Sequence, residues 1–132
     1  MDQIEQFMLS PTFAVAGAST NRDKYGNKVL RCFKQNNHPV IAINPRAKEI
    51  EGLSCVNSVL DLPDNVDSLS IITPPKITEQ VVQQAITKGI KNIWMQPGAE
   101  SAAAIDQCKK NGINIIADGS CLLVVLHYHE HD

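Results

Sequence analysis

The chain has 132 residues, of which 43% are hydrophobic and 20% charged, and its formal net charge at pH 7 is −2. This length and composition are typical of one globular domain and exclude disordered and collagen-like chains. The small negative charge gives no general electrostatic reason to expect nucleic acid or an anionic membrane as a partner. No apolar stretch approaches the roughly 20 residues that a membrane helix needs, so we expect a cytoplasmic protein.

Short apolar runs recur along the chain at residues 13–17, 39–44, 69–73, 92–96 and 113–118. Each run is too short for a helix and too continuously apolar for a strand with one face in water, so each predicts a strand buried on both faces. A further short strand is expected at residues 54–56, before a turn of helix in the sequence NSVLDLP.

Segments with helical spacing lie between these strands. One helix is expected in residues 27–37; a second is expected from a cap at Thr78 to Gly89, and a third from Ser101 to Gly112. Helices that alternate with buried strands are typical of a parallel sheet covered on both faces.

The predicted fold is therefore α/β: a Rossmann-like doubly wound parallel sheet with three α/β/α layers and the strand order 3-2-1-4-5-6. In this order the strand that starts at Leu69 lies beside the strand that ends at Gly17. We expect residues 1–132 to form one domain, with a core at about 8–126 and a C-terminal tail at 127–132.

Ligands of such sheets bind beyond the carboxyl ends of the strands, where the strand order reverses. Here this place lies between residues 17–20 and residues 73–75. The first segment consists of small residues that let backbone N–H groups approach an anion, and a side chain at Gly17 is expected to block the approaching phosphate. The second segment, Thr-Pro-Pro, is stiff and offers a flat apolar surface for a base or ribose. A nucleotide fits both segments.

The glycine pattern of NAD-binding loops is absent. The pattern G-x-G-x-x-G needs glycine at positions 19 and 22, where Ser19 and Arg22 stand. The acid expected after the second strand is replaced by the sequence NPRAK, in which Arg46 and Lys48 favour a phosphate on the ribose. NADP carries such a phosphate on the 2′ oxygen and coenzyme A (CoA) on the 3′ oxygen.

The chain resembles the small single-domain CoA-binding proteins of bacteria and archaea, which are similar to the CoA-binding domain of the succinyl-CoA synthetase alpha subunit. The matching motifs, spread over about residues 8–126, are GAS at 17–19, KYGNKV at 24–29, INP at 43–45, Gly52 with S-x-x-D-x-P at 58–63, WMQPGAES at 94–101 and ADGSCLLVVL at 117–126. Ser120 stands where the family's last motif is expected to have proline, which leaves the shape of that loop open.

The resemblance implies a Rossmann-like fold in which residues 17–20 hold phosphates and residues 44–46 border the adenosine 3′-phosphate. It implies that the TPP and QPGA loops line the rest of the site. The synthetase's activity does not carry over, because its phosphorylated histidine lies in a second domain and its nucleotide-charging subunit is a separate chain. The cofactor-binding candidates are Gly17, Ala18, Ser19, Thr20, Lys24, Tyr25, Asn44, Pro45, Arg46, Thr73, Pro74, Pro75, Gln96 and Gly98.

Several candidates have a second interpretation. Lys24 and Tyr25 fit ligand contact and the start of a helix equally, and Gly98 fits a helix start. Trp94, inside a buried strand, is expected to be a core residue. Cys121 is the one thiol near the expected site, either a redox group or an inert core residue.

The remaining cysteines and the histidines give no metal signal. None of the four cysteines forms a C-x-x-C pair, so neither a zinc knuckle nor a redox dithiol is indicated and reduced thiols are expected. The C-terminal sequence HYHEHD alternates histidines, but we interpret it as a frayed, solvated end and predict no metal.

We therefore expect non-catalytic binding of coenzyme A or an acyl-CoA. The alternative is an NADP-binding reductase or a redox sensor, although the chain offers no set of histidine, tyrosine and lysine beside the expected nicotinamide position. A third interpretation is a regulatory module that keeps the fold without the ligand. The exposed edge of the sheet leaves a homodimer open, and no partner enzyme is indicated.

Overall fold

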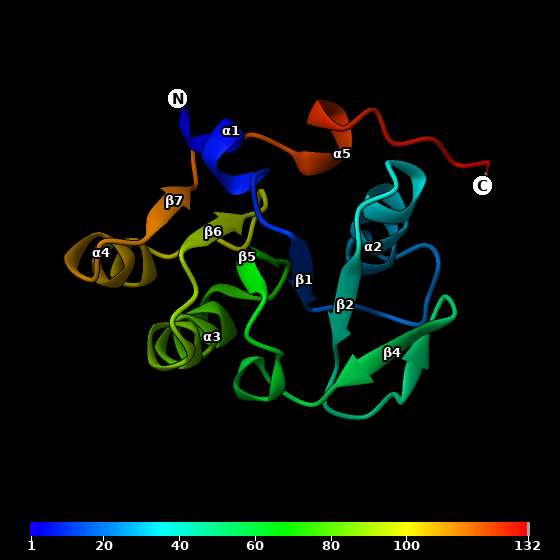
Figure 1. Cartoon of the computed structure of the whole chain (residues 1–132), viewed down its shortest axis with the longest axis horizontal. Helices are drawn as coiled ribbons and strands as arrows, with labels where there is room; N and C mark the ends of the chain where they lie inside the picture. Colours follow the sequence, from blue (N-terminus) through cyan, green and yellow to red (C-terminus); the bar gives the residue numbers. More distant parts are fainter. Residues whose placement is uncertain (132) are drawn as a thin grey trace.

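The computed structural model describes residues 1–131, in which a seven-stranded sheet lies between two layers of helices (Figure 1). Asp132, the last residue of the expected tail, lies outside the described residues. The elements in chain order are α1 (Gln3–Phe7), β1 (Thr12–Ala16), α2 (Tyr25–Gln35), β2 (Val40–Ile43), β3 (Glu49–Ile50), β4 (Leu53–Val56), the 3-10 helix η1 (Val59–Asp61), β5 (Val66–Ile71), α3 (Pro75–Lys88), β6 (Asn92–Met95), α4 (Ala102–Lys110), β7 (Asn114–Ile116) and α5 (Leu122–Val125).

The sheet has the order β3-β4-β2-β1-β5-β6-β7. All neighbours except β3 and β4 pair in parallel. The six strands expected from the sequence are β1, β2, β4, β5, β6 and β7, and their order confirms 3-2-1-4-5-6. The prediction missed β3, whose two residues are too few to show a hydrophobic period. Because β2 and β5 flank β1, the strand order reverses at β1.

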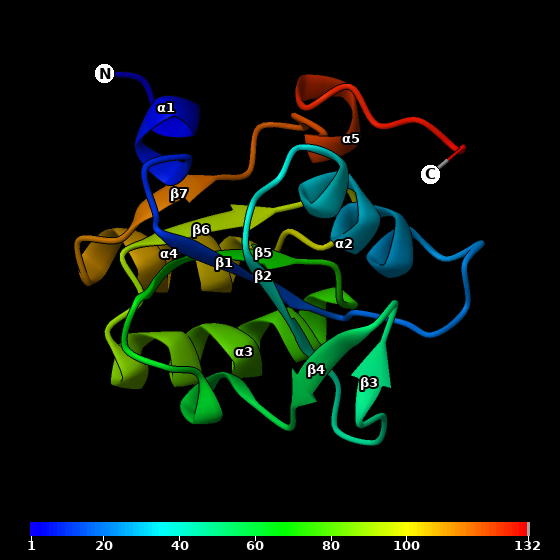
Figure 2. The ribbon, with the colours of Figure 1, turned by 45° about the vertical axis from the view of Figure 1, so that its right-hand side comes forward.

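Side chains of alternate strand residues fill two separate cores, as expected for strands buried on both faces. In β1, Ala14 and Ala16 face α3 and α4, whereas Phe13 and Val15 face α2. Figure 2 shows α3 and α4 together on one side of the sheet and α1, α2 and α5 on the other. The three-layer α/β/α arrangement is thus confirmed.

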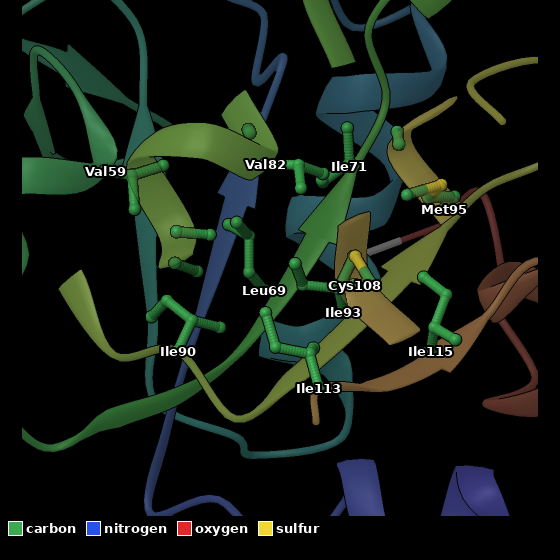
Figure 3. Close-up of a cluster of buried hydrophobic side chains, with 14 of the residues drawn as sticks. Val59, Leu69, Ile71, Val82, Ile90, Ile93, Met95, Cys108, Ile113 and Ile115 are labelled. Atoms are coloured by element: carbon green, nitrogen blue, oxygen red, sulfur yellow. The ribbon is translucent and has the colours of Figure 1, made fainter. Parts of the chain in front are cut away.

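The core under α3 and α4 consists of aliphatic side chains that interlock between sheet and helices (Figure 3). Leu69, Ile71 and Ile93 of the central strands belong to this core together with Val82 of α3 and Cys108 of α4, and all five are fully buried. On the opposite face Trp94 is also fully buried, and its indole Nε1 donates to the Ser120 carbonyl at 3.0 Å. The expected core role of Trp94 is confirmed.

The starts of two helices differ from those expected from helical spacing. α2 begins at Tyr25, two residues before the expected segment, and Lys24 is its N-cap residue without a side-chain cap. The second interpretation of Lys24 and Tyr25, as the start of a helix, is thus confirmed. α3 begins at Pro75, because proline is tolerated in the first turn of a helix where its missing N–H is not needed. Thr78, the predicted cap, is a buried residue of this first turn whose hydroxyl bonds to Thr73. The predicted cap of α4 is confirmed, since Ser101 Oγ accepts from the Ala104 N–H.

The C-terminal segment does not fray as predicted. Its Tyr128 ring lies against the Arg31 guanidinium of α2, 5.5 Å from the ring centroid, and Glu130 pairs with Lys28 of α2 at 2.8 Å. Gln35 exchanges two hydrogen bonds with the backbone of His129. The segment therefore packs on α2 through contacts that sequence patterns do not reveal.

Two further features of residues 1–131 bear on partners. No three side chains of histidine, cysteine, aspartate or glutamate in this part lie close enough together to hold a metal ion. None of its helices has the length and apolar character needed to cross a membrane.

Candidate functional site

The loop between β1 and α2, residues 17–24, lies where the strand order reverses. Gly17 starts it with a φ of +92°, a conformation that favours glycine. A Cβ atom at Gly17 would stand 2.1 Å from the carbonyl oxygen of Ile72, which follows β5. The prediction that a side chain there blocks a phosphate was therefore wrong in its reason, because the side chain would first collide with the backbone beside β5.

Two side-chain amides fasten the β1–α2 loop. Asn44, directly after β2, donates to the Ala18 carbonyl at 2.9 Å, and Asn27 of α2 donates to the Ser19 carbonyl at 2.9 Å. Asn44 also accepts from the Arg46 N–H at 2.8 Å and so shapes its own turn. The first residues of the loop are thus fixed by both neighbouring elements.

The fastened loop presents unused donors. Within residues 1–131, the backbone N–H groups of Ala18, Ser19 and Thr20 donate no hydrogen bond. The 11 residues of α2 follow, and the N-terminus of such a helix carries a partial positive charge. Free N–H groups beside a helix N-terminus form an anion-binding arrangement.

A cavity of about 410 Å³ opens beside this loop, between the carboxyl ends of the strands and α3. We call it the β1–α3 cavity. Five of the predicted site residues line it: Gly17, Ala18, Asn44, Pro45 and Thr73. The rest of its lining is Ala16, Ile43, Asn57, Ser58, Val59, Ile77, Gln80, Val81 and Gln84.

Sequence reasoning missed the contribution of α3 to this cavity. Ile77, Gln80, Val81 and Gln84 are spaced by three and four residues and therefore share one face of the helix. Val82 is fully buried under α3, whereas its neighbour Val81 is only half-buried and borders the cavity. The two glutamines repeated on one face of the helix were the sequence pattern that could have predicted this contribution of α3.

Other predicted residues do not line the cavity. Arg46 is exposed on the turn directly after Pro45. Thr20 and Lys24 are exposed on the β1–α2 loop, and Pro74 and Pro75 are exposed at the start of α3. Ser19 uses its hydroxyl oxygen to accept from the Asn21 N–H at 3.1 Å, and Gly98 is exposed beyond β6.

Tyr25 and Gln96 belong to a different cluster, on the α2 side of the sheet. The Tyr25 hydroxyl donates to Gln96 Oε1 at 3.2 Å and contacts the sulfur of Cys121. The same Gln96 oxygen accepts from the Leu122 N–H at 2.9 Å, and the Gln96 amide donates to Ser70 at 3.2 Å. Burial, followed by the hydrogen bond to Cys121, raises the pKa of Tyr25, so its phenol stays protonated. These contacts tie β6 to the start of α5.

A second cavity of about 410 Å³ lies in the groove between α3 and α4, lined mainly by polar side chains that include Lys76, Glu79 and Gln83. It lies away from the β1–α2 loop and from the switch in strand order. The β1–α3 cavity is therefore the candidate site.

Comparison with known proteins identifies the family of this chain. Residues 11–127 match the sequence model of a family described as a CoA binding domain. The chain is 30% identical over 106 residues to the ADP-forming acetate–CoA ligase I of Archaeoglobus fulgidus, covering 80% of this chain but only 16% of the ligase. It thus spans about one sixth of that relative's length.

Solved structures agree with this assignment. A conserved hypothetical protein of Pyrococcus furiosus is 39% identical and superimposes with a TM-score of 0.83, covering 86% of this chain and 97% of its own. A dinucleotide-forming acetyl-coenzyme A synthetase of Candidatus Korarchaeum cryptofilum, in complex with phosphate and ADP, is 27% identical with a TM-score of 0.77, covering 89% of this chain and 27% of the synthetase. The chain belongs to the CoA-binding domain family.

Proposed function

We propose that this protein binds coenzyme A or an acyl-CoA at the β1–α3 cavity and catalyses no reaction there. The observation that carries the proposal is the position of the cavity, which opens at the switch in strand order, between α3 and the loop that carries the free N–H groups of residues 18–20. This is where nucleotide ligands of such sheets bind. Membership of the CoA-binding family supports CoA as the nucleotide.

The two parts of the cavity suit the two parts of a nucleotide. The pyrophosphate accepts hydrogen bonds from the N–H groups of residues 18–20, next to the positive end of α2. The adenosine lies against Ile77 and Val81, which give the cavity an apolar wall. Gln80 and Gln84 lie beside this wall and supply donors and acceptors for the base or ribose.

Arg46 distinguishes CoA from related nucleotides in this proposal. Its guanidinium is exposed beside Pro45, which lines the cavity, and it forms no ion pair within residues 1–131. We assign it to the 3′-phosphate of CoA, because guanidinium groups bind phosphate oxygens through two parallel hydrogen bonds.

Calorimetry with CoA, 3′-dephospho-CoA and NADP tests this assignment. We expect CoA to bind more tightly than 3′-dephospho-CoA, and NADP to bind weakly. Arg46→Gln is expected to weaken CoA binding roughly tenfold and to leave 3′-dephospho-CoA unchanged. Lys109→Gln is the control, because Lys109 is exposed in the last turn of α4.

Each result bears on a separate part of the proposal. If CoA does not bind to the wild-type protein, the proposed function is wrong. If CoA and 3′-dephospho-CoA bind equally, the role of Arg46 is wrong. Tight NADP binding with enhanced NADPH fluorescence would instead favour the NADP-dependent reductase or redox sensor.

A further inference from the structure

The tip of the β3–β4 hairpin contains an unfavourable residue. Ile50 pairs with Leu53, so Glu51 and Gly52 form a two-residue turn with φ angles of +52° and +76°. Such turns prefer asparagine, aspartate or glycine at the first position. A residue with a long side chain pays roughly 1 kcal/mol or more in this left-handed conformation. An unfavourable residue such as Glu51 is retained where its side chain makes contacts that offset this cost.

The side chain of Glu51 contacts the β1–α2 loop and the helix that follows it. Its carboxylate pairs with Arg22 of the loop at 2.5 Å and accepts from the Asn27 amide of α2 at 3.2 Å. The Glu51 side chain is only 15% exposed, compared with 52% for Arg22. Figure 2 shows the hairpin tip lying beside the loop.

Asn27 extends this contact into the loop. It is fully buried, and the amide group that donates to Glu51 also donates to the Ser19 carbonyl at 2.9 Å. Its oxygen accepts from Arg31 at 2.7 Å, and Arg31 donates in turn to the Arg22 carbonyl at 2.9 Å. Glu51 is therefore linked to both Ser19 and Arg22, near the two ends of the loop.

We propose that Glu51 is a positioning residue that holds the β1–α2 loop in its ligand-binding conformation. This inference rests on the proposed CoA binding, because the loop supplies the N–H groups for the pyrophosphate. Residues 20–24 are all exposed, so without Glu51 the loop samples more conformations. Ordering it then costs free energy when the ligand binds, which lowers affinity.

Glu51→Asn separates this role from a merely structural one. Asparagine followed by Gly52 suits the turn better than glutamate does, so the free energy of unfolding is expected to stay equal or to rise. CoA binding is nevertheless expected to weaken roughly three- to tenfold, because the link to Arg22 and Asn27 is lost. Glu49→Gln is the matched control, since Glu49 is an exposed acid of the same hairpin.

Hydrogen exchange of the unliganded proteins provides a second readout that does not depend on CoA. Amides of residues 21–24 are expected to exchange faster in Glu51→Asn than in the wild-type and Glu49→Gln proteins. Glu51→Gln keeps an acceptor for Asn27, so its exchange rates are expected to lie between those of the wild-type protein and those of Glu51→Asn.

Faster exchange together with weaker CoA binding supports the proposal. Unchanged exchange, or unchanged affinity in a wild-type background that binds CoA, overturns it. If the wild-type protein binds no CoA, the proposed function fails, while the exchange comparison still decides whether Glu51 holds the loop.

Discussion

Gly26, in the first turn of α2, packs directly against the carbonyl group of Gly17. A Cβ atom at Gly26 would stand 2.0 Å from that oxygen, far inside van der Waals contact. The absence of a side chain at Gly26 thus lets α2 start close to the end of β1. In dinucleotide-binding loops the third glycine permits this close approach of helix and strand. Here Gly26 serves that purpose, four positions beyond the place of that glycine in the usual pattern.

We predict that Gly26→Ala destabilises the protein by about 3 kcal/mol or more, because neither the helix nor the strand backbone can move aside easily. Without the collision, alanine in a helix would instead stabilise the protein by roughly 0.5–1 kcal/mol. Urea unfolding measures the sign. The control is Gly112→Ala, where no atom lies within 4 Å of the new Cβ and only the positive φ of +68° opposes it, at about 1 kcal/mol. Equal effects of the two substitutions would contradict the proposed close approach.

Two adjacent glutamines of α3 can test whether CoA occupies the β1–α3 cavity. Gln84 lines this cavity, whereas Gln83 lines the groove between α3 and α4. We expect Gln84→Trp to weaken CoA binding at least tenfold, because the indole occupies the space of the adenosine. Gln83→Trp adds the same side chain one residue earlier and is expected to leave the affinity unchanged. Calorimetry on both variants checks this, and similar affinities would place the ligand elsewhere.

Much of the fold could be predicted because it depends on patterns with a short period. The order of six strands follows from buried apolar runs that alternate with helices, and the Ser101 cap follows from its hydroxyl side chain. The sequence does not show where α3 begins, since Pro75 fits both a loop and a first helical turn. The two-residue strand β3 is also too short to leave a pattern.

The site could be predicted only where backbone geometry decides it. Gly17 and Asn44 lie at strand ends, so the strand order alone brings them together at the cavity. Gln96 lies at another strand end, but its side chain points to the opposite face and bonds to Tyr25. Beyond the last residue of a strand, tertiary contacts decide to which face of the sheet a side chain points. No pattern in the sequence predicts these contacts.

Two buried thiols make the free energy of unfolding depend on pH in the alkaline range. Burial raises the pKa of Cys32 and of Cys108 from 9.0 to about 11. Above pH 9 the unfolded chain therefore loses these protons while the folded protein retains them. The stabilisation is fully present below pH 9 and is lost as the pH rises to about 11.

We expect the free energy of unfolding to fall between pH 9 and 11, and to fall less steeply in Cys108→Ala than in the wild-type protein. Urea unfolding at intervals across this range measures both slopes. The difference between the slopes isolates Cys108, because lysines and tyrosines titrate alike in the two proteins. Parallel curves would show that the Cys108 thiol ionises equally in the folded and unfolded states.

The packing of the C-terminal segment on α2 can be tested at Tyr128. This residue combines a ring contact with Arg31, a hydroxyl that donates to Glu130 at 3.1 Å, and a backbone N–H that donates to the Leu123 carbonyl at 2.8 Å. We expect Tyr128→Ala to lower the free energy of unfolding by roughly 1 kcal/mol, because the cation–π contact and the packing of the ring are lost. Tyr128→Phe is expected to keep most of this, since phenylalanine retains the ring.

Limited digestion with carboxypeptidase gives an independent measure of the same contact. The hydrogen bonds to Lys28 and Tyr128 lower the pKa of Glu130. The ion pair between Glu130 and Lys28 is therefore expected to be intact at pH 7 and to be lost only when acid protonates Glu130. At pH 7 we expect slow digestion of the wild-type protein and faster digestion of Tyr128→Ala, which lacks the ring contact. His131→Ala changes an exposed residue beyond these contacts and serves as the control. If Tyr128→Ala and His131→Ala are digested at the same rate, the packing of the segment on α2 does not depend on the Tyr128 ring.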